Sequence, residues 1–220
     1  MGNIDDIIRL KKFGTVPVPF GALRELYHDF VSPAKKIAEL CSKGLLIRVK
    51  RGLYIVSDMI VGEKPAGELI ANHLYGPSYV SMETALQYYG MIPEGVYSIE
   101  SATTKQPKQY DTPYGVFRYH HFEVNYYRIG IGMEHMKNGS AYLLASPEKS
   151  LCDLLIKTRG LRIRSRISML SYLIDFLRID EESLAALDPA LLRECVITGP
   201  RKETLYYLEE TIKWIKSSGT

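Results

Sequence analysis

The sequence lacks the features that mark secreted, membrane-spanning and disulfide-stabilised proteins. Its 220 residues contain only three cysteines, Cys41, Cys152 and Cys195, which are far apart. Buried free thiols in a reducing compartment explain an odd number of distant cysteines better than a disulfide framework does. No apolar run approaches the ~18 residues that a membrane span needs. The acidic pair Asp5-Asp6 is not typical of a signal peptide. We therefore expect a cytoplasmic protein that does not enter a membrane.

Patterns for metal binding and for nucleophilic catalysis are also missing. His120 and His121 are adjacent on an expected strand, where neighbouring side chains point to opposite faces, so they cannot chelate one ion. The other histidines have no Cys, His or Asp partner at ligand spacing, and no serine has the glycines of a nucleophile elbow. Gly139-Ser140 with Asp153 is only faintly similar to the start of a nucleotidyltransferase site, because such a site needs two neighbouring carboxylates. We expect no enzyme activity, no metal and no cofactor.

Net charge is small, +3 at pH 7, but it is unevenly distributed. Residues 1–60 contain ten Lys or Arg and six Asp or Glu, whereas residues 61–220 contain 18 and 19. Between residues 35 and 51, six basic side chains accompany a single acidic one, Glu39. The positive charge is therefore concentrated in one short segment, as binding to an anionic partner requires.

The basic segment has the pattern of a helix followed by a hairpin. Ser32 can cap a helix, Pro33 suits its first position, and Gly44 can end it. Residues 46–50 and 53–56 alternate like two strands joined by a tight turn. The apolar stripe expected to face the core contains Ala34, Ile37, Ala38 and Cys41, with Leu40 at its border.

The preceding residues complete the order of a winged helix-turn-helix domain. Residues 4–10 and 20–27 each have the pattern of a short amphipathic helix. The inward-facing residues expected in the first of these are Ile4, Ile7 and Ile8, with Leu10 as a further candidate. Helix, helix, turn, helix and hairpin is the winged-helix order, in which the third helix enters the major groove of DNA. We therefore expect a DNA-binding domain at residues 1–60.

The expected recognition helix and wing carry the side chains that would contact DNA. The helix N-terminus offers unpaired N–H groups to a phosphate, lysines reach phosphates or base edges, and a carboxylate can accept from a cytosine amino group. The expected DNA-binding residues are Ser32, Lys35, Lys36, Glu39, Ser42, Lys43, Arg48, Lys50 and Arg51. The alternative is that these charges only keep an exposed face in water.

A second domain is expected at residues 67–220, after a linker over 57–66 in which Gly62 and Pro65 interrupt the periodicity. Strands are indicated at 96–103, 114–122, 126–131 and 141–145, and helices at 68–75, at 81–89 and from Ser146 onward. The expected fold is α+β: an N-terminal winged helix-turn-helix domain, followed by a mixed α/β C-terminal domain that ends in a helical tail.

A second group of basic residues has no acidic residue among them. It contains Lys157, Arg159, Arg162, Arg164 and Arg166. These residues form either a solvated loop between helices or a surface that binds nucleic acid or an acidic partner. The sequence leaves both interpretations open.

Three stretches resemble the antitoxins of AbiE-type toxin–antitoxin systems, the abortive-infection systems of phage defence often classed as type IV. They are the expected wing at residues 44–54, the segment YVSMETALQYYGMIPE at 79–94, and ASPEKSLCDLL at 145–155. The middle segment is the most distinctive of the three, because many regulators share the wing. The likeness covers residues 1 to about 160.

The resemblance implies that the N-terminal domain represses its own operon by binding inverted repeats in double-stranded promoter DNA. It also implies that the C-terminal domain counteracts a nucleotidyltransferase-like toxin, directly or indirectly. Two alternatives remain open. One is a stand-alone winged-helix regulator with a ligand-sensing C-terminal domain, and the other is a catalytic transferase that turns over nucleotides with a divalent metal. A nucleotidyltransferase-like reading frame directly downstream would favour the antitoxin.

Overall fold

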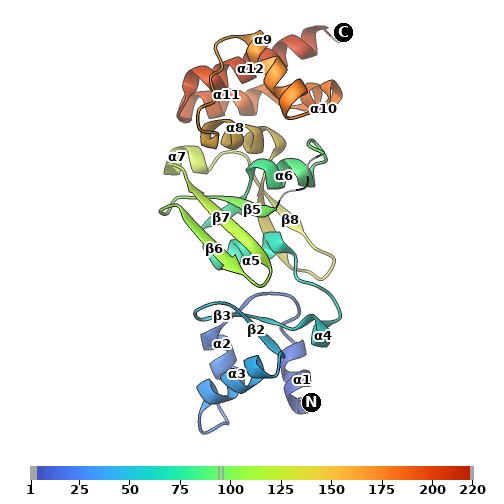
Figure 1. Ribbon diagram of the computed structural model, residues 1–220, viewed down its shortest axis with the longest axis vertical. Coiled ribbons are helices and arrows are strands. Elements are labelled where there is room, and N and C mark those ends of the chain that lie inside the picture. The colour runs from blue at the N-terminus through green and yellow to red at the C-terminus, as the bar shows by residue number, and fades with distance from the viewer. Residues whose placement is uncertain (1–3, 94, 96, 219–220) are drawn as a thin grey trace.

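Figure 1 shows the chain arranged in three tiers along its long axis: N-terminal helices with a small sheet, a central six-stranded sheet, and C-terminal helices. The computed structural model describes residues 4–93, 95 and 97–218. The fold is mixed α+β with a mixed sheet and a helical C-terminal part, as the sequence predicts.

The N-terminal tier packs short helices against a three-stranded antiparallel sheet with strand order β1-β3-β2. Its elements are α1 (Ile4–Lys11), β1 (Val18–Pro19), α2 (Phe20–Leu26), α3 (Pro33–Ser42), β2 (Leu46–Lys50) and β3 (Leu53–Val56). Buried side chains from all three helices and from both hairpin strands form one core, among them Leu10, Leu23, Ile37, Leu40, Leu46 and Val56. The expected hairpin and the helix before it are both present.

Helix α3 begins and ends where the sequence predicts. Pro33 is its first residue, and Gly44 follows its end with a left-handed φ of +69°. The expected side-chain cap is absent: Ser32 is the N-cap, but only its backbone carbonyl bonds to the helix, accepting from the Lys36 N–H at 3.1 Å. The apolar stripe is also rotated from the prediction, because Ile37 and Leu40 are buried whereas both alanines of the predicted stripe are exposed.

Helix α1 turns a different face to the core than its isoleucines suggest. Ile4 and Ile8 are 74% and 59% exposed, so their predicted burial is wrong. The buried residues of the helix are Asp6 and Leu10. Asp6 is tolerated inside because it forms an ion pair with Lys36 of α3.

The central sheet has the strand order β6-β7-β5-β4-β9-β8 and combines parallel with antiparallel pairs. Its strands are β4 (Ser78–Val80), β5 (Ser98–Thr103), β6 (Lys108–Thr112), β7 (Gly115–His121), β8 (Ile131–His135) and β9 (Ala141–Ala145). The strand predicted at 126–131 is wrong, because α7 (Val124–Tyr127) occupies its start and β8 follows it. Val96, predicted to begin a strand, lies outside the described residues.

Three short helices follow the small sheet: α4 (Asp58–Val61), α5 (Gly67–Leu74) and α6 (Met82–Tyr88). Helix α4 packs on the N-terminal core, whereas α5 and α6 pack on the central sheet. Helix α4 lies inside the segment predicted as a linker, where the Ser57 hydroxyl accepts a hydrogen bond from the N–H of Met59 at 3.4 Å. The linker is therefore partly helical.

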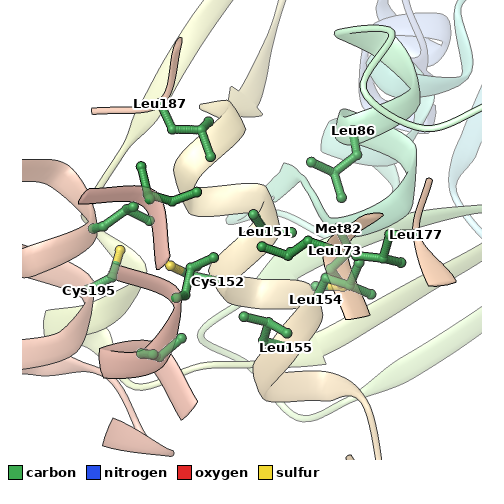
Figure 2. Packing of buried hydrophobic residues seen from close by; sticks show 14 of the residues in the cluster. Met82, Leu86, Leu151, Cys152, Leu154, Leu155, Leu173, Leu177, Leu187 and Cys195 are labelled. Carbon is green, nitrogen blue, oxygen red and sulfur yellow. The ribbon is translucent and has the colours of Figure 1, made fainter. Parts of the chain in front are cut away.

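The C-terminal tier is helical and is organised around α8 (Pro147–Lys157). The other elements are α9 (Arg166–Ser171), the π-helical turn η1 (Tyr172–Phe176), α10 (Glu181–Ala186), α11 (Pro189–Thr198) and α12 (Lys202–Ser218). Figure 2 shows α8 at the centre of the packing, with Met82 and Leu86 of α6 on one side and Cys195 of α11 on the other. On α12, an apolar stripe that includes Leu205, Leu208 and Ile212 is buried.

The hairpin also packs against the central tier. Val49, Leu53 and Ile55 belong to the same hydrophobic cluster as Leu69 and Leu74 of α5. The hairpin is therefore packed between this cluster and the N-terminal core, and Arg48 and Arg51 are its exposed residues. The division into domains at 1–60 and 67–220 stays a prediction.

Candidate nucleic-acid interface

The exposed face of α3 has short side chains around one lysine. Ala34, Lys35, Ala38 and Ser42 are all exposed or partly exposed, whereas Ile37 and Leu40 face the core. Within the part of the chain that the structure describes, Lys35 forms no ion pair. Because alanine and serine side chains are short, the helix backbone can approach a groove closely, with a free ammonium group beside it.

Lys36 is not on this face. Its Nζ donates to Oδ2 of Asp6 at 2.8 Å and lies 5.1 Å from the centroid of the Phe30 ring. Only 10% of the Lys36 side chain is exposed. The hydrogen bond to Asp6 raises the pKa of Lys36, so its charge is held inside the N-terminal tier. The sequence expectation that Lys36 contacts DNA is corrected by this geometry.

Glu39, Ser42 and Lys43 lie at the C-terminal end of α3, but they bond to one another. The ammonium of Lys43 donates to Oε1 of Glu39, and this bond lowers the pKa of the carboxyl. The Ser42 hydroxyl donates to the Glu39 carbonyl oxygen at 2.8 Å. A base or phosphate would therefore have to compete with existing hydrogen bonds at this end of the helix.

Arg48 and Arg51 are the exposed cations of the hairpin. Arg48, on β2, lies close enough to Cys41 of α3 for its charge to oppose the rise in the pKa of that thiol caused by burial. Arg51 is in the turn before Gly52, whose φ of +81° is left-handed. No ion pair is formed by either arginine with the residues that the structure describes. Arg48 therefore extends the surface of α3, and Arg51 lies at the hairpin turn.

Lys50 points toward the central tier, contrary to the prediction that it contacts DNA. Its ammonium donates to the carbonyl oxygen of Leu74 and lies 5.8 Å from the centroid of the Tyr110 ring. Burial, together with the positive charges of Lys108 and Lys105, lowers the pKa of Lys50. The side chain faces away from α3 because the strand register shifts between Arg48 and Lys50.

Helices α1 and α2 of the N-terminal tier carry further exposed cations. Arg24 lies on α2 with its side chain exposed, and Lys11 and Lys12 at the end of α1 are also exposed. Arg9 is different, because it forms ion pairs with Asp5 and Asp29 at 3.0 Å. The packing of the helices, and not the sequence pattern, determines which of these cations is paired within the described chain and which is free.

The second basic group is divided by the fold. Lys157 is held by Glu83 at 2.9 Å and Glu100 at 3.2 Å, and the guanidinium of Arg166 lies 4.9 Å from the centroid of the Trp214 ring. The remaining members of the group are Arg159, Arg162 and Arg164. They are exposed, and none forms an ion pair with a residue that the structure describes. Lys157 and Arg166 are therefore engaged within the chain, and three arginines of the group stay exposed.

Asp153, weighed in the sequence as a catalytic carboxylate, is fully buried in a network that the sequence does not predict. It forms an ion pair with Lys149 at 3.0 Å and accepts hydrogen bonds from Tyr79 at 3.0 Å and Ser81 at 2.7 Å. Both charged side chains have no exposed surface. This network joins β4, the start of α6 and α8 inside the core.

Comparisons with known proteins add no identification. No family model matches the chain, and no curated protein matches it with significant similarity. The described residues 4–93, 95 and 97–218 hold no group of three or more His, Cys, Asp or Glu side chains suited to a metal ion. They also form no helix with the length and apolarity to span a membrane.

Proposed function

We propose that this chain is a DNA-binding repressor of its own operon, with α3 as the recognition helix and β2–β3 as the wing of a winged helix. The observation that carries the proposal is the exposed face of α3, on which short side chains flank Lys35 while Arg48 extends the same surface. No hydrogen bond or ion pair within the described chain engages Lys35, Arg48 or Arg51.

The positive charge available to DNA is smaller than the sequence indicates. Lys36 and Lys50 are engaged inside the protein, and Lys43 is balanced by Glu39. Arg24, on the helix that packs against α3, is a further exposed cation that could contact a phosphate. Phosphate contacts position a protein on DNA, so sequence preference depends on the short exposed side chains of α3 and on Lys35.

We further propose that the operon encodes a nucleotidyltransferase-like toxin that this chain counteracts, as in AbiE-type systems. The support is the resemblance of residues 79–94 and 145–155 to such antitoxins, together with the contact between those two segments. Tyr79 and Ser81 from the first donate to Asp153 in the second. The two segments that carry the resemblance therefore belong to one packed unit.

The DNA-binding proposal is tested by fluorescence anisotropy with a duplex from the region directly upstream of this chain's coding sequence. A shuffled duplex of the same composition is the comparison. We expect tighter binding to the upstream duplex, and weaker binding by Lys35→Ala and Arg48→Ala, by about tenfold each. Lys202→Ala, an exposed lysine at the start of α12, is the matched control and should bind like the wild type. Equal affinity of the wild type for both duplexes would reject a role as a specific repressor.

The antitoxin proposal is tested separately, by co-expression with the product of an adjacent nucleotidyltransferase-like reading frame. We expect growth arrest from the toxin alone and rescue by the full chain. Rescue by the Lys35→Ala variant would show that neutralisation tolerates a loss of DNA affinity of about tenfold. Failure of the wild-type chain to rescue growth would contradict the antitoxin role and leave the DNA-binding proposal standing.

A further inference from the structure

A pocket of about 530 Å³ opens where the central sheet meets the end of α8 and the turn η1. Its charged wall is formed by Glu83 of α6, Glu100 of β5, Arg118 of β7 and Lys157 of α8. Its apolar wall includes Ile92, Phe176 and Leu177. Small-molecule sites have volumes of ~300–1,000 Å³ and combine apolar walls with a few convergent polar groups.

Glu100 forms a fixed negative charge at the base of the charged wall. The carboxylate accepts from the Ser98 hydroxyl at 2.7 Å, and Nε2 of His120 and Nζ of Lys157 lie 2.6 and 3.2 Å from it. Burial alone would raise the pKa of Glu100. The bond with His120 and the charge of Lys157 outweigh that effect and bring the pKa to about 2. Glu100 therefore holds the cations of the wall in place, with both of its carboxylate oxygens engaged by Ser98, Arg118, His120 and Lys157.

Two charged groups of the wall keep free hydrogen-bonding positions. Glu83 uses Oε2 to accept from Lys157 at 2.9 Å, while its Oε1 has no hydrogen bond within the described structure. Arg118 donates from Nε to Gln109 at 3.2 Å and from Nη1 to Ser98 at 2.8 Å and Glu100 at 3.4 Å, and its Nη2 has no acceptor among the described residues. Both side chains are partly exposed. The pocket thus offers one carboxylate and one guanidinium to a ligand.

The apolar wall carries an aromatic ring that the protein leaves in water. Phe176 is 69% exposed and stacks on Tyr172, with ring centroids 5.2 Å apart and an interplanar angle of 15°. It is the last residue of η1, and π-helical turns occur frequently at functional sites. Leu177 is buried directly beside it. An apolar group in the pocket would cover the exposed ring.

We infer that this pocket binds a free α-amino acid with a large apolar side chain. Glu83 receives the ammonium group, Arg118 receives the carboxylate, and the side chain packs on Phe176 and Leu177. The wall contains two carboxylates and two cations, so it favours a zwitterion over a strongly charged ligand such as a nucleotide. The inference is independent of DNA binding, and each can fail without the other.

The test is isothermal titration calorimetry of the full chain with L-phenylalanine and with L-leucine. N-acetyl-L-phenylalanine lacks the ammonium charge and 2-phenylethylamine lacks the carboxylate, so each removes one predicted contact. We expect at least one of the two amino acids to bind and both analogues to bind at least about tenfold more weakly than L-phenylalanine. Glu83→Gln and Arg118→Gln should each weaken binding of the amino acid by a similar factor, whereas Lys202→Gln should not.

The analogue series uses only the wild-type chain, so it decides the question even if a pocket variant fails to fold. Circular dichroism of each variant establishes whether it is folded before it is titrated. Absence of binding by both amino acids at millimolar concentration would overturn the inference. Equal binding of L-phenylalanine and its two analogues would also overturn it, because the charged wall would then contribute nothing.

Discussion

Lys35 and Lys36 are neighbours in the sequence but lie in different environments on α3. Lys35 is exposed, whereas Lys36 forms an ion pair with Asp6, whose side chain is 3% exposed. Removal of one partner from a buried pair leaves the other charge without compensation. The same substitution at the two positions should therefore have different consequences.

We predict that Lys36→Ala lowers the free energy of unfolding by about 3 kcal/mol. Lys35→Ala should change it by less than about 0.5 kcal/mol, as is usual for an exposed side chain. Urea unfolding of both variants measures the difference. Equal stability of the two variants would contradict the assignment of Lys36 to the interior and restore it as a candidate DNA contact.

Glu100 should make the free energy of unfolding depend on pH. Its pKa is 4.5 without perturbation and about 2 in the folded chain. Because the folded value is the lower one, the stabilisation is fully present above pH 4.5 and is lost as the pH falls toward 2. Urea unfolding at several pH values should show this loss in the wild type and a shallower one in Glu100→Gln. Identical pH profiles of wild type and variant would contradict the account.

Two helices of the chain begin with Ser-Pro, at Ser32-Pro33 and Ser146-Pro147, and serine before proline suits an N-cap at both. In the structure, only one of the two serines forms the side-chain cap. The Ser146 hydroxyl accepts from the Lys149 N–H of α8 at 3.2 Å, whereas Ser32 makes no side-chain bond to α3. The difference follows from the N-cap backbone, with φ and ψ of −61° and 164° at Ser146 but −141° and 89° at Ser32.

We predict that Ser146→Ala lowers the free energy of unfolding by about 1 kcal/mol, the usual contribution of a helix cap. Ser32→Ala is the matched control and should change it by a few tenths of that amount, because no cap bond is lost. Thermal or urea unfolding compares them. A larger effect at Ser32 than at Ser146 would reject the difference between the two caps.

The start and end of α3, the hairpin and the final helix could be predicted because local signals determine them. Pro33 and Gly44 bound α3, and the stripe of α12 has a clear helical period. The local pattern could not predict which face of α1 is buried, nor that charged side chains of α8 lie in the core. Asp6 and Asp153 are buried carboxylates stabilised by partners distant in the sequence: Lys36 for Asp6, and Tyr79 and Ser81 for Asp153.

The whole molecule explains why the candidate interface is smaller than the basic segment. The hairpin lies between the N-terminal tier and the central sheet (Figure 1), so its two sides have different neighbours. Arg48 and Arg51 remain in solvent, while Lys50 bonds to α5. Alternation along a strand predicts two faces, but it does not indicate that a later part of the chain covers one of them.

The pocket at Glu83 and Arg118 is likewise formed by elements that only the complete fold brings together. The four charged residues of its wall lie up to 74 residues apart in the sequence and form no motif: Glu83, Glu100, Arg118 and Lys157. They meet because β5 and β7 are adjacent in the sheet and α8 ends beside them. A site assembled from four elements has no local signature, unlike a recognition helix.

The central claim, that α3 and the hairpin bind DNA through exposed cations, is tested most directly by the salt dependence of binding. The measurement compares the wild type with a Lys35→Ala, Arg48→Ala, Arg51→Ala triple variant on the upstream duplex at several salt concentrations. Each lost phosphate contact should lower the slope of log affinity against log salt by about 0.9, giving a total decrease of about 2–3. An unchanged slope and affinity in a folded triple variant would contradict the account.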